Sequence, residues 1–286
     1  MYAITGANGQ LGALVIDRLL ARTPPEQMVA TVRRLEDGAA LRDKGVTVRQ
    51  ADYDRPETLA AAFAGVDRLL LISSSEIGRR TPQHRAVIDA AAAAGVGLIV
   101  YTSVLHADRS PLSVAPEHRE TEAALAASGV PHVLLRNGWY SENHLAGLPA
   151  ALAHGALLGA ARDGRVSSAA RADYADAAVA VLTADDQAGK VYELAGDEAW
   201  SLSELAAEIG RQVGRTIPYQ DMPEAAYAGV LKRSGLPDAL AELFADSDAG
   251  AAAGALFDNS RTLRGLIGRP TTPIARSVAQ ALARQG

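Results

Sequence analysis

The glycine-rich segment at residues 5–12 constrains the fold of this chain most strongly. It reads TGANGQLG and follows a short apolar run at residues 2–4. After it, Leu11, Val15 and Leu19 recur at helical spacing. A glycine-rich turn between a buried strand and a helix is typical of a loop that binds a dinucleotide. The alternative is a structural turn whose glycines only permit its backbone conformation.

Each glycine of this segment has a distinct expected role. Gly6 allows the tight turn, Gly9 keeps side-chain atoms away from a pyrophosphate, and Gly12 lets the helix pack closely on the strand. The free N–H groups and the positive dipole end of the helix would then face the phosphates. We expect the pyrophosphate to be held by Gly6, Ala7, Asn8, Gly9, Gln10 and Leu11.

Strand-like and helix-like stretches alternate regularly through the first half of the chain. Apolar, partly β-branched runs predict strands at residues 28–33, 46–50, 66–72, 98–103 and 133–136. Helix patterns with short links separate them. This alternation predicts an α/β protein with a Rossmann-type, doubly wound parallel sheet.

Beyond Trp139 the pattern loosens, although a strand near residues 190–195 is expected to rejoin the sheet. We therefore predict an NADP-binding domain at residues 1–145 and a smaller, interleaved C-terminal α/β lobe on the substrate side at residues 146–286, with an approximate boundary. Ser201 and Glu204 form the pattern of a capping box at a helix start. Small residues and acids at 246–254 predict a mobile surface segment.

Composition excludes several classes of function. The net charge is −5 with a pI near 5.7, which argues against nucleic acid and anionic membrane surfaces as partners. There is no cysteine, hence no disulfide or thiolate metal site, and the six histidines show no metal-ligand spacing, so we expect no metal. No apolar run approaches the roughly 20 residues that span a bilayer. We expect a cytoplasmic protein, and the sequence leaves open whether it forms a homodimer.

The end of the second predicted strand bears on the choice of cofactor. An acid at this position binds the ribose 2′-hydroxyl of NAD, whereas arginine accommodates the 2′-phosphate of NADP. Here Arg33 and Arg34 follow the strand, which favours NADP, with NADPH as the preferred form; a solvated arginine pair is the alternative. Asp52 fits the adenine-facing position. The serines that follow the next buried strand either line the cleft or form an ordinary turn: Ser73, Ser74 and Ser75.

A missing motif is equally informative. Most short-chain dehydrogenases carry Tyr-x-x-x-Lys on the helix after the fifth strand, but this chain has lysine only at positions 44, 190 and 232. The corresponding helix begins PEHRETE at residue 116 and has no tyrosine there. A conventional alcohol dehydrogenase or sugar epimerase is therefore not expected.

Seven blocks in order along the chain resemble the NmrA-like atypical branch of the short-chain dehydrogenases. They are TGANGQLG at 5–12, VRQADYD at 48–54, LLLISSSEIG at 69–78, YTSVLHAD at 101–108, LLRNGWYSEN at 134–143, RADYADAA at 171–178 and KVYELAGD at 190–197. Within that branch the series is similar to the short-chain type of bacterial NAD(P)H:quinone oxidoreductase.

The resemblance implies further site residues. The nicotinamide and substrate would be bordered by Asn137, Gly138, Trp139, Tyr140, Ser141 and Glu142. Tyr140 and Asn143 are candidates for the quinone side of the pocket, or else a packed aromatic and a helix-start amide. His118 stands where some relatives carry lysine, and we expect either a proton donor that titrates near neutrality or a structural histidine. Arg171, Asp173 and Tyr174 either close the site or anchor their loop.

The implied activity is reduction of a quinone by direct hydride transfer from NADPH, without flavin or metal. Hydride addition to an ordinary carbonyl builds a basic alkoxide that needs a positioned acid, whereas a quinone yields a stabilised hydroquinone anion. The absent Tyr-Lys pair is consistent with a quinone substrate. Two alternatives remain: an NADP(H)-sensing regulator without catalysis, and an atypical reductase of another carbonyl or an enone.

Overall fold

The computed structural model describes residues 1–285 of the chain. Its principal sheet has seven strands in the order β3-β2-β1-β4-β5-β6-β8. The strands are β1 (Tyr2–Ile4), β2 (Met28–Val32), β3 (Thr47–Gln50), β4 (Arg68–Leu71), β5 (Leu98–Val104), β6 (His132–Asn137) and β8 (Val191–Leu194). The pairs β3–β2, β2–β1, β1–β4 and β4–β5 are all parallel. The predicted doubly wound α/β sheet is therefore confirmed.

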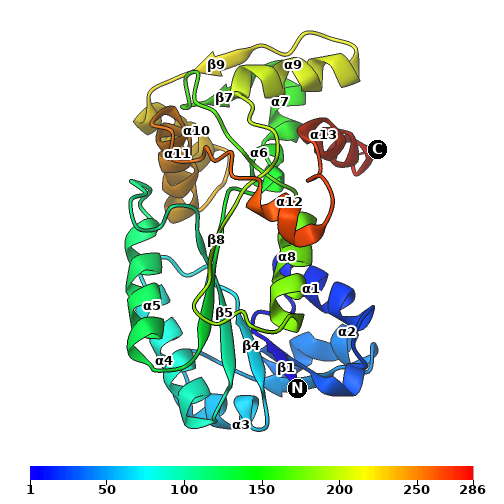
Figure 1. Cartoon of the computed structure of the whole chain (residues 1–286). Coiled ribbons are helices and arrows are strands. Elements are labelled where there is room, and N and C mark those ends of the chain that lie inside the picture. The colour runs from blue at the N-terminus through cyan, green and yellow to red at the C-terminus, as the bar shows by residue number, and fades with distance from the viewer. Residues whose placement is uncertain (286) are drawn as a thin grey trace. The chain divides into compact units, whose positions relative to one another are not determined.

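Helices connect these strands and flank the sheet (Figure 1). They are α1 (Gln10–Leu20), α2 (Ala39–Arg42), α3 (Leu59–Phe63), α4 (Arg80–Ala93), α5 (Ala115–Ala127) and α8 (Arg171–Thr183), with short 3-10 turns at Pro25–Gln27, Leu35–Gly38 and Pro56–Thr58. The order of strands reverses between β1 and β4. At such a switch point the crevice beyond the carboxyl ends of the strands is open for a ligand.

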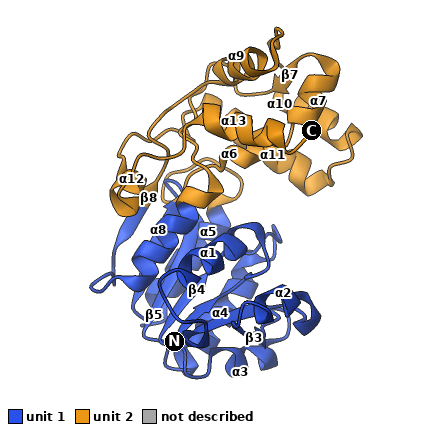
Figure 2. Ribbon diagram, turned by 90° about the vertical axis from the view of Figure 1, so that its right-hand side faces the viewer, with its two compact units in different colours: residues 1–107, 116–136, 174–192 blue, residues 108–115, 137–173, 193–286 orange. Residues whose placement is uncertain are grey.

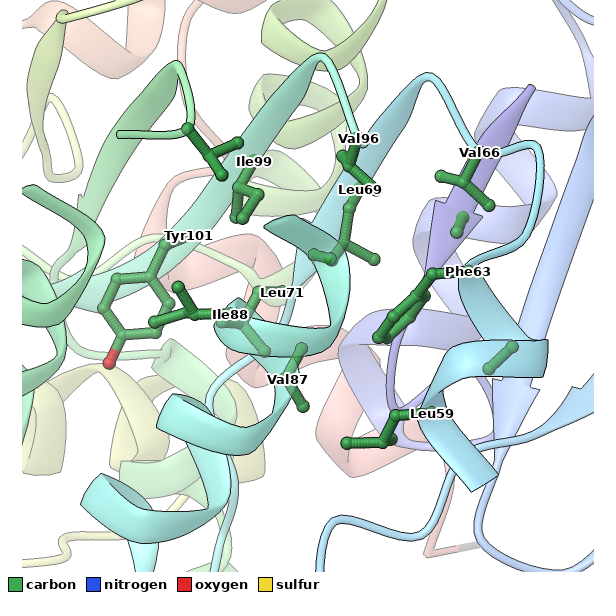
Figure 3. Close-up of a cluster of buried hydrophobic side chains, with 14 of the residues drawn as sticks. Leu59, Phe63, Val66, Leu69, Leu71, Val87, Ile88, Val96, Ile99 and Tyr101 are labelled. Atoms are coloured by element: carbon green, nitrogen blue, oxygen red, sulfur yellow. The ribbon is translucent and has the colours of Figure 1, made fainter. Parts of the chain in front are cut away.

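The core on one face of this sheet is built from alternate strand residues. Leu69 and Leu71 of β4 point to the same side, where Phe63 of α3 and Val87 of α4 cover them, and all four side chains are fully buried. Figure 3 shows these residues together, with Tyr101 of β5 at the edge of the cluster. Each such side chain contributes about 1.5–3 kcal/mol through burial. This packing holds the carboxyl edge of the sheet in place.

The chain divides into two compact units that are interleaved along the sequence. The first comprises residues 1–107, 116–136 and 174–192, and the second residues 108–115, 137–173 and 193–286 (Figure 2). The division falls within β8, which nevertheless takes part in the seven-stranded sheet. The domain boundary at residue 145 stays a prediction.

The second unit contains a small parallel pair of strands and several helices. The strands are β7 (Leu157–Gly159) and β9 (Tyr219–Asp221), with Leu157 opposite Tyr219. The helices are α6 (Ser141–Leu145), α7 (Leu148–His154), α9 (Leu202–Val213), α10 (Glu224–Arg233), α11 (Asp238–Ala252), α12 (Thr262–Ile267) and α13 (Ile274–Ala283). Ser201 and Glu204 form the predicted capping box at the start of α9.

The prediction of a surface segment at residues 246–254 was wrong. Most of it belongs to α11, and Ser247 and Asp248 are buried. Asp248 accepts a hydrogen bond from the Ala160 N–H at 3.0 Å, and Asp246 accepts from both the N–H and the hydroxyl of Ser113. The sequence predicted exposed acids here because the groups that donate hydrogen bonds to Asp246 and Asp248 lie far away along the chain.

Candidate functional site

The glycine-rich turn leaves the first helix open at its N-terminus. Gly6 adopts a φ of +55°. The Gly9 N–H donates a hydrogen bond to the Gly6 carbonyl at 2.9 Å, which closes the turn. Gly9 is the N-cap of α1, and no side chain caps the helix. The first N–H groups of an uncapped helix, with the positive end of its dipole, form an anion site.

Gly12 brings this helix against the turn, as the sequence predicts. A Cβ at Gly12 would lie 2.2 Å from the carbonyl oxygen of Gly6 and 2.8 Å from the Cα of Ala7. Only glycine fits there without moving the backbone. The close packing aligns the start of α1 with the end of β1.

A cleft of about 650 Å³ opens directly beside this turn, within the first unit. Its lining includes nearly all of the residues that the sequence placed there for the first unit: Gly6, Asn8, Gly9, Gln10, Leu11, Arg33, Ser73, Ser74 and Ser75. Ala7 is fully buried beneath the turn and does not line the cleft. The structure thus brings together three segments that are far apart in the sequence.

Asp52 does not line the cleft, whereas its neighbours Ala51 and Tyr53 do. The Asp52 carboxylate instead accepts the Asp54 N–H at 3.1 Å, as part of a turn. Burial raises the pKa of the Tyr53 hydroxyl to about 12, so it remains protonated. The sequence did not predict Tyr53 as a lining residue, because residue spacing alone does not show which side chains of this segment reach the cleft.

The sequence did not predict Thr31, Asp37 and Ile72 as lining residues. Gly12 and Arg34 also line the cleft, although the sequence singled them out only for helix packing and as the neighbour of Arg33. Arg34 and Asp37 form a two-bonded pair, with Nε–Oδ2 and Nη2–Oδ1 distances of 3.0 and 2.8 Å. Arg33 pairs with Glu76, and this hydrogen bond is the main reason that the pKa of the guanidinium is raised. Both arginines stay charged at the rim of the cleft.

The loop at residues 72–75 is held by side chains from elements beneath it. The N–H groups of Ile72 and Ser73 donate to the hydroxyls of Thr5 and Thr102, each at 2.9 Å. The Ser74 N–H donates to Nε2 of His84, also at 2.9 Å. These bonds turn the backbone of the loop toward the carboxyl edge of the sheet and fix one wall of the cleft.

His84 is a structural histidine within this support. Because Nε2 accepts the Ser74 N–H, the proton must sit on Nδ1, which donates to the Thr121 hydroxyl at 2.9 Å. Burial lowers the pKa of His84 to about 3, so the neutral tautomer persists. Arg80 completes the arrangement, since its Nε donates to the Ser74 carbonyl at 2.6 Å.

His118 lies in the same buried region. Its Nδ1 is 2.7 Å from the hydroxyl of Tyr101, and its side chain is 5% exposed. Burial lowers the pKa of His118 well below its usual range. Of the two alternatives for His118, this burial favours the structural histidine over a proton donor that titrates near neutrality. The sequence does not reveal that helix α5 buries the imidazole against β5.

The segment from Asn137 to Asn143 belongs to the second unit. The Arg171 guanidinium stacks on the Tyr140 ring at 4.7 Å and donates to Oδ1 of Asn143 at 3.2 Å. Both carboxylate oxygens of Glu142 accept the Arg171 N–H, at 3.0 and 3.1 Å, and so cap α8. Burial raises the pKa of Tyr140, which keeps its hydroxyl protonated.

The other members of this segment are fixed mainly by backbone bonds. The Gly138 N–H donates to the Leu194 carbonyl at 2.7 Å, and the Ser141 N–H to the Ala169 carbonyl at 2.9 Å. Trp139 packs edge-on against Phe244. Within residues 1–285, Asn137 Oδ1 is one of a few buried side-chain atoms without a hydrogen-bond partner. A buried acceptor of this kind is suited to a donor from a bound molecule.

Asp173 anchors the loop that precedes α13. It accepts hydrogen bonds from both the N–H and the hydroxyl of Thr272 and pairs with Arg269 at 2.8 Å. This geometry favours the anchoring role over direct participation in a site. Over residues 1–285, no group of three or more metal-ligating side chains is present, and no helix is long and apolar enough to cross a membrane.

The uncapped helix, the glycine turn and the arginine at the end of β2 line one cleft whose chemistry suits a nicotinamide dinucleotide. The family of NAD(P)H-binding proteins matches residues 6–185, and the chain belongs to that family. The chain is 58% identical to quinone oxidoreductase 2 of Escherichia coli over 279 residues, which covers 98% of each protein. The resemblance inferred from the sequence blocks is thereby confirmed.

Solved structures agree with this assignment. The crystal structure of an NADPH-dependent quinone oxidoreductase from Escherichia coli, complexed with NADPH, superposes with a TM-score of 0.96 at 57% identity, covering 99% of this chain and 100% of that one. The triphenylmethane reductase of Citrobacter sp. complexed with NADP(H) gives 0.95 at 37% identity, covering 98% and 100%. NmrA, a transcriptional regulator solved with NADP, shares only 16% identity, so this likeness concerns the fold alone.

Proposed function

We propose that this protein reduces quinones to hydroquinones with NADPH, by direct hydride transfer and without flavin. The observation that carries the proposal is the cleft in which the open start of α1 and the Arg33 guanidinium lie along one lining. The former suits the pyrophosphate and the latter the 2′-phosphate. The 58% identity to quinone oxidoreductase 2 over nearly the whole chain supports the substrate class. We place the protein in the cytoplasm, where reduced nicotinamide cofactors are available.

When bound, the cofactor would supply a hydride, and the chain would position the reactants. The pyrophosphate would be held by Gly6, Asn8, Gly9, Gln10 and Leu11, with Ala7 buried beneath them. The loop at residues 72–75 forms a wall fixed by Thr5, Thr102 and His84. Tyr140 and Asn143, steadied by Arg171, are our candidates for contact with the quinone. Such positioning is the larger share of catalysis when the acceptor is already activated.

The proton needs no strong general acid in this scheme. A quinone that accepts a hydride becomes a hydroquinone anion with a phenol-like pKa, which water protonates. His118 is neutral and hydrogen-bonded to Tyr101, which suits a structural role. The low pKa of its imidazole makes it a poor proton store at neutral pH.

Steady-state oxidation of NADPH with a panel of benzoquinones and naphthoquinones tests the proposal. We expect turnover from flavin-free protein that added FAD does not increase. Gly9→Val serves as the inactive control, because a Cβ at Gly9 already lies 3.1 Å from the Gly6 carbonyl and the larger side chain extends into the phosphate site. Tight NADPH binding without oxidation by any quinone would instead identify an NADP(H)-sensing regulator.

A further inference from the structure

An acid that sequence reasoning did not single out pairs with Arg33, one of the residues that line the cleft beside the glycine turn. Glu76 follows the serine loop, and its Oε1 forms an ion pair with Nη2 of Arg33 across 43 residues of sequence. Arg33 is the group that we assign to the 2′-phosphate. The carboxylate therefore occupies an N–H donor of the guanidinium that the phosphate needs.

Glu76 is held in place by contacts other than Arg33. Its Oε2 accepts a hydrogen bond from Nε2 of Gln83 at 2.9 Å and lies 3.4 Å from Nη1 of Arg79. Gln83 is 2% exposed, so it provides a rigid anchor from α4. The backbone N–H of Glu76 donates to the Ser74 hydroxyl at 3.2 Å. When Arg33 turns to another anion, these contacts keep the carboxylate nearby.

The nearby cation Arg79 does not cancel the negative charge that a phosphate on Arg33 would meet. Arg79 is shared with Asp54, since its Nη2 lies 2.9 Å from Asp54 Oδ1. Gln83 also donates to Asp54, at 3.2 Å. A phosphate on Arg33 would thus approach two carboxylates that are already positioned, and like charges at such range repel each other.

We propose that Glu76 determines how strongly this protein prefers the phosphorylated cofactor, by competing with the 2′-phosphate for Arg33. The competition lowers the affinity for NADPH and for NADP⁺ and leaves NADH unaffected, because NADH has a hydroxyl at that position. The inference rests on the proposed function, specifically on Arg33 as the ligand of the 2′-phosphate. Glu76 is in this sense a specificity residue and not part of the hydride-transfer chemistry.

Isothermal titration of the full chain with NADPH, NADP⁺ and NADH tests this competition. Glu76→Gln keeps the shape and the hydrogen bond to Gln83 but removes the charge. We expect it to bind NADPH and NADP⁺ about three- to tenfold more tightly, with a gain that shrinks at high salt, and to bind NADH within about twofold of the wild type. Glu76→Asp retains the charge and should stay close to the wild type.

Two further variants make the result interpretable. Glu57→Gln removes the same charge from the exposed Arg55 pair, outside the cleft lining, and should leave all three affinities unchanged. Arg33→Ala should weaken NADPH and spare NADH. Equal weakening of both by Arg33→Ala would overturn the assignment of the 2′-phosphate.

Three other results would contradict the proposed competition between Glu76 and the 2′-phosphate. If Arg33→Ala acts on NADPH alone but Glu76→Gln fails to tighten NADPH, the competition is refuted while the site assignment stands. Weaker NADPH binding by Glu76→Gln would mean that the acid orients Arg33 instead. Equal effects of Glu76→Gln and Glu76→Asp would show that geometry, and not charge, matters.

Discussion

Replacing Gly12 with alanine tests the close contact between α1 and the phosphate turn. The new Cβ would meet the Gly6 carbonyl oxygen at 2.2 Å, its carbon at 2.9 Å and the Ala7 Cα at 2.8 Å. All three neighbours are backbone atoms, which cannot rotate away. A tolerable carbon–oxygen contact is about 3.2 Å, so the helix start and the turn must separate by about 1 Å.

Two consequences follow from this displacement. Overpacking of this kind lowers the free energy of unfolding by about 1–3 kcal/mol. The N–H groups at the start of α1 also move relative to the pyrophosphate, and a misplacement of about 1 Å is expected to reduce kcat/KM by about 100-fold. A 100-fold loss corresponds to about 2.7 kcal/mol, so the effects on cofactor use and on stability should be of similar size.

Urea unfolding measures the first effect, and steady-state kinetics together with NADPH titration measure the second. Gly265→Ala provides the matched control, because Gly265 lies inside α12 and a Cβ there meets nothing within 4 Å. That variant should gain up to about 1 kcal/mol from helix propensity and bind NADPH normally. Wild-type NADPH affinity in Gly12→Ala, with unchanged stability, would refute the proposed role of the glycine.

Three other predictions concern groups outside the phosphate turn. His118→Ala should keep kcat within about tenfold of the wild type and nearly independent of pH from about 6 to 8, whereas loss of a true general acid costs about 10²–10⁴; stopped-flow and steady-state rates decide this. Burial lowers the pKa values of His84, His118 and His144, so urea unfolding should show a free energy of unfolding that falls as the pH drops below about 6.5. The pKa of Asp248 is raised to about 7, which opposes this fall, so Asp248→Asn should make the fall steeper. Glu122→Ala should lower the free energy of unfolding by about 3–5 kcal/mol in thermal or urea melts, since it removes the carboxylate of a largely buried ion pair with Arg136. Glu57→Ala at an exposed pair should change it by less than about 1 kcal/mol.

The pH prediction depends on the sign of each shift. A histidine with a lowered pKa in the folded state binds fewer protons than in the unfolded state, so acid favours unfolding between the unfolded and folded pKa values. For His84 this window runs from about 6.5 down to about 3. A carboxyl with a raised pKa has the opposite effect between about 7 and 4. A stability that rises on acidification through pH 6 would contradict this balance.

The architecture of the first unit was readable from local patterns. The alternation of apolar runs with helix patterns predicts the parallel sheet, because strands that are buried on both faces appear in the sequence as uninterrupted apolar stretches. The glycine turn could also be located, because its backbone needs Gly6 at positive φ and no Cβ at Gly12. Both requirements are local, so both leave a mark in the sequence.

Contacts between distant segments were not readable in this way. Nothing near Glu76 indicates that it meets Arg33, and nothing near His118 indicates that Tyr101 and the packing of α5 on β5 keep it neutral. The burial of Asp248 against the Ala160 N–H is of the same kind.

Side-chain direction accounts for the remaining difference. After β3 the chain turns, and Ala51 and Tyr53 line the cleft, whereas Asp52 between them does not and accepts the Asp54 N–H instead. Neighbouring residues of one short segment therefore differ in whether they reach the cleft. Sequence spacing identifies the segment that reaches the adenine side, but the packing of β3 in the sheet selects which of its side chains face the cleft.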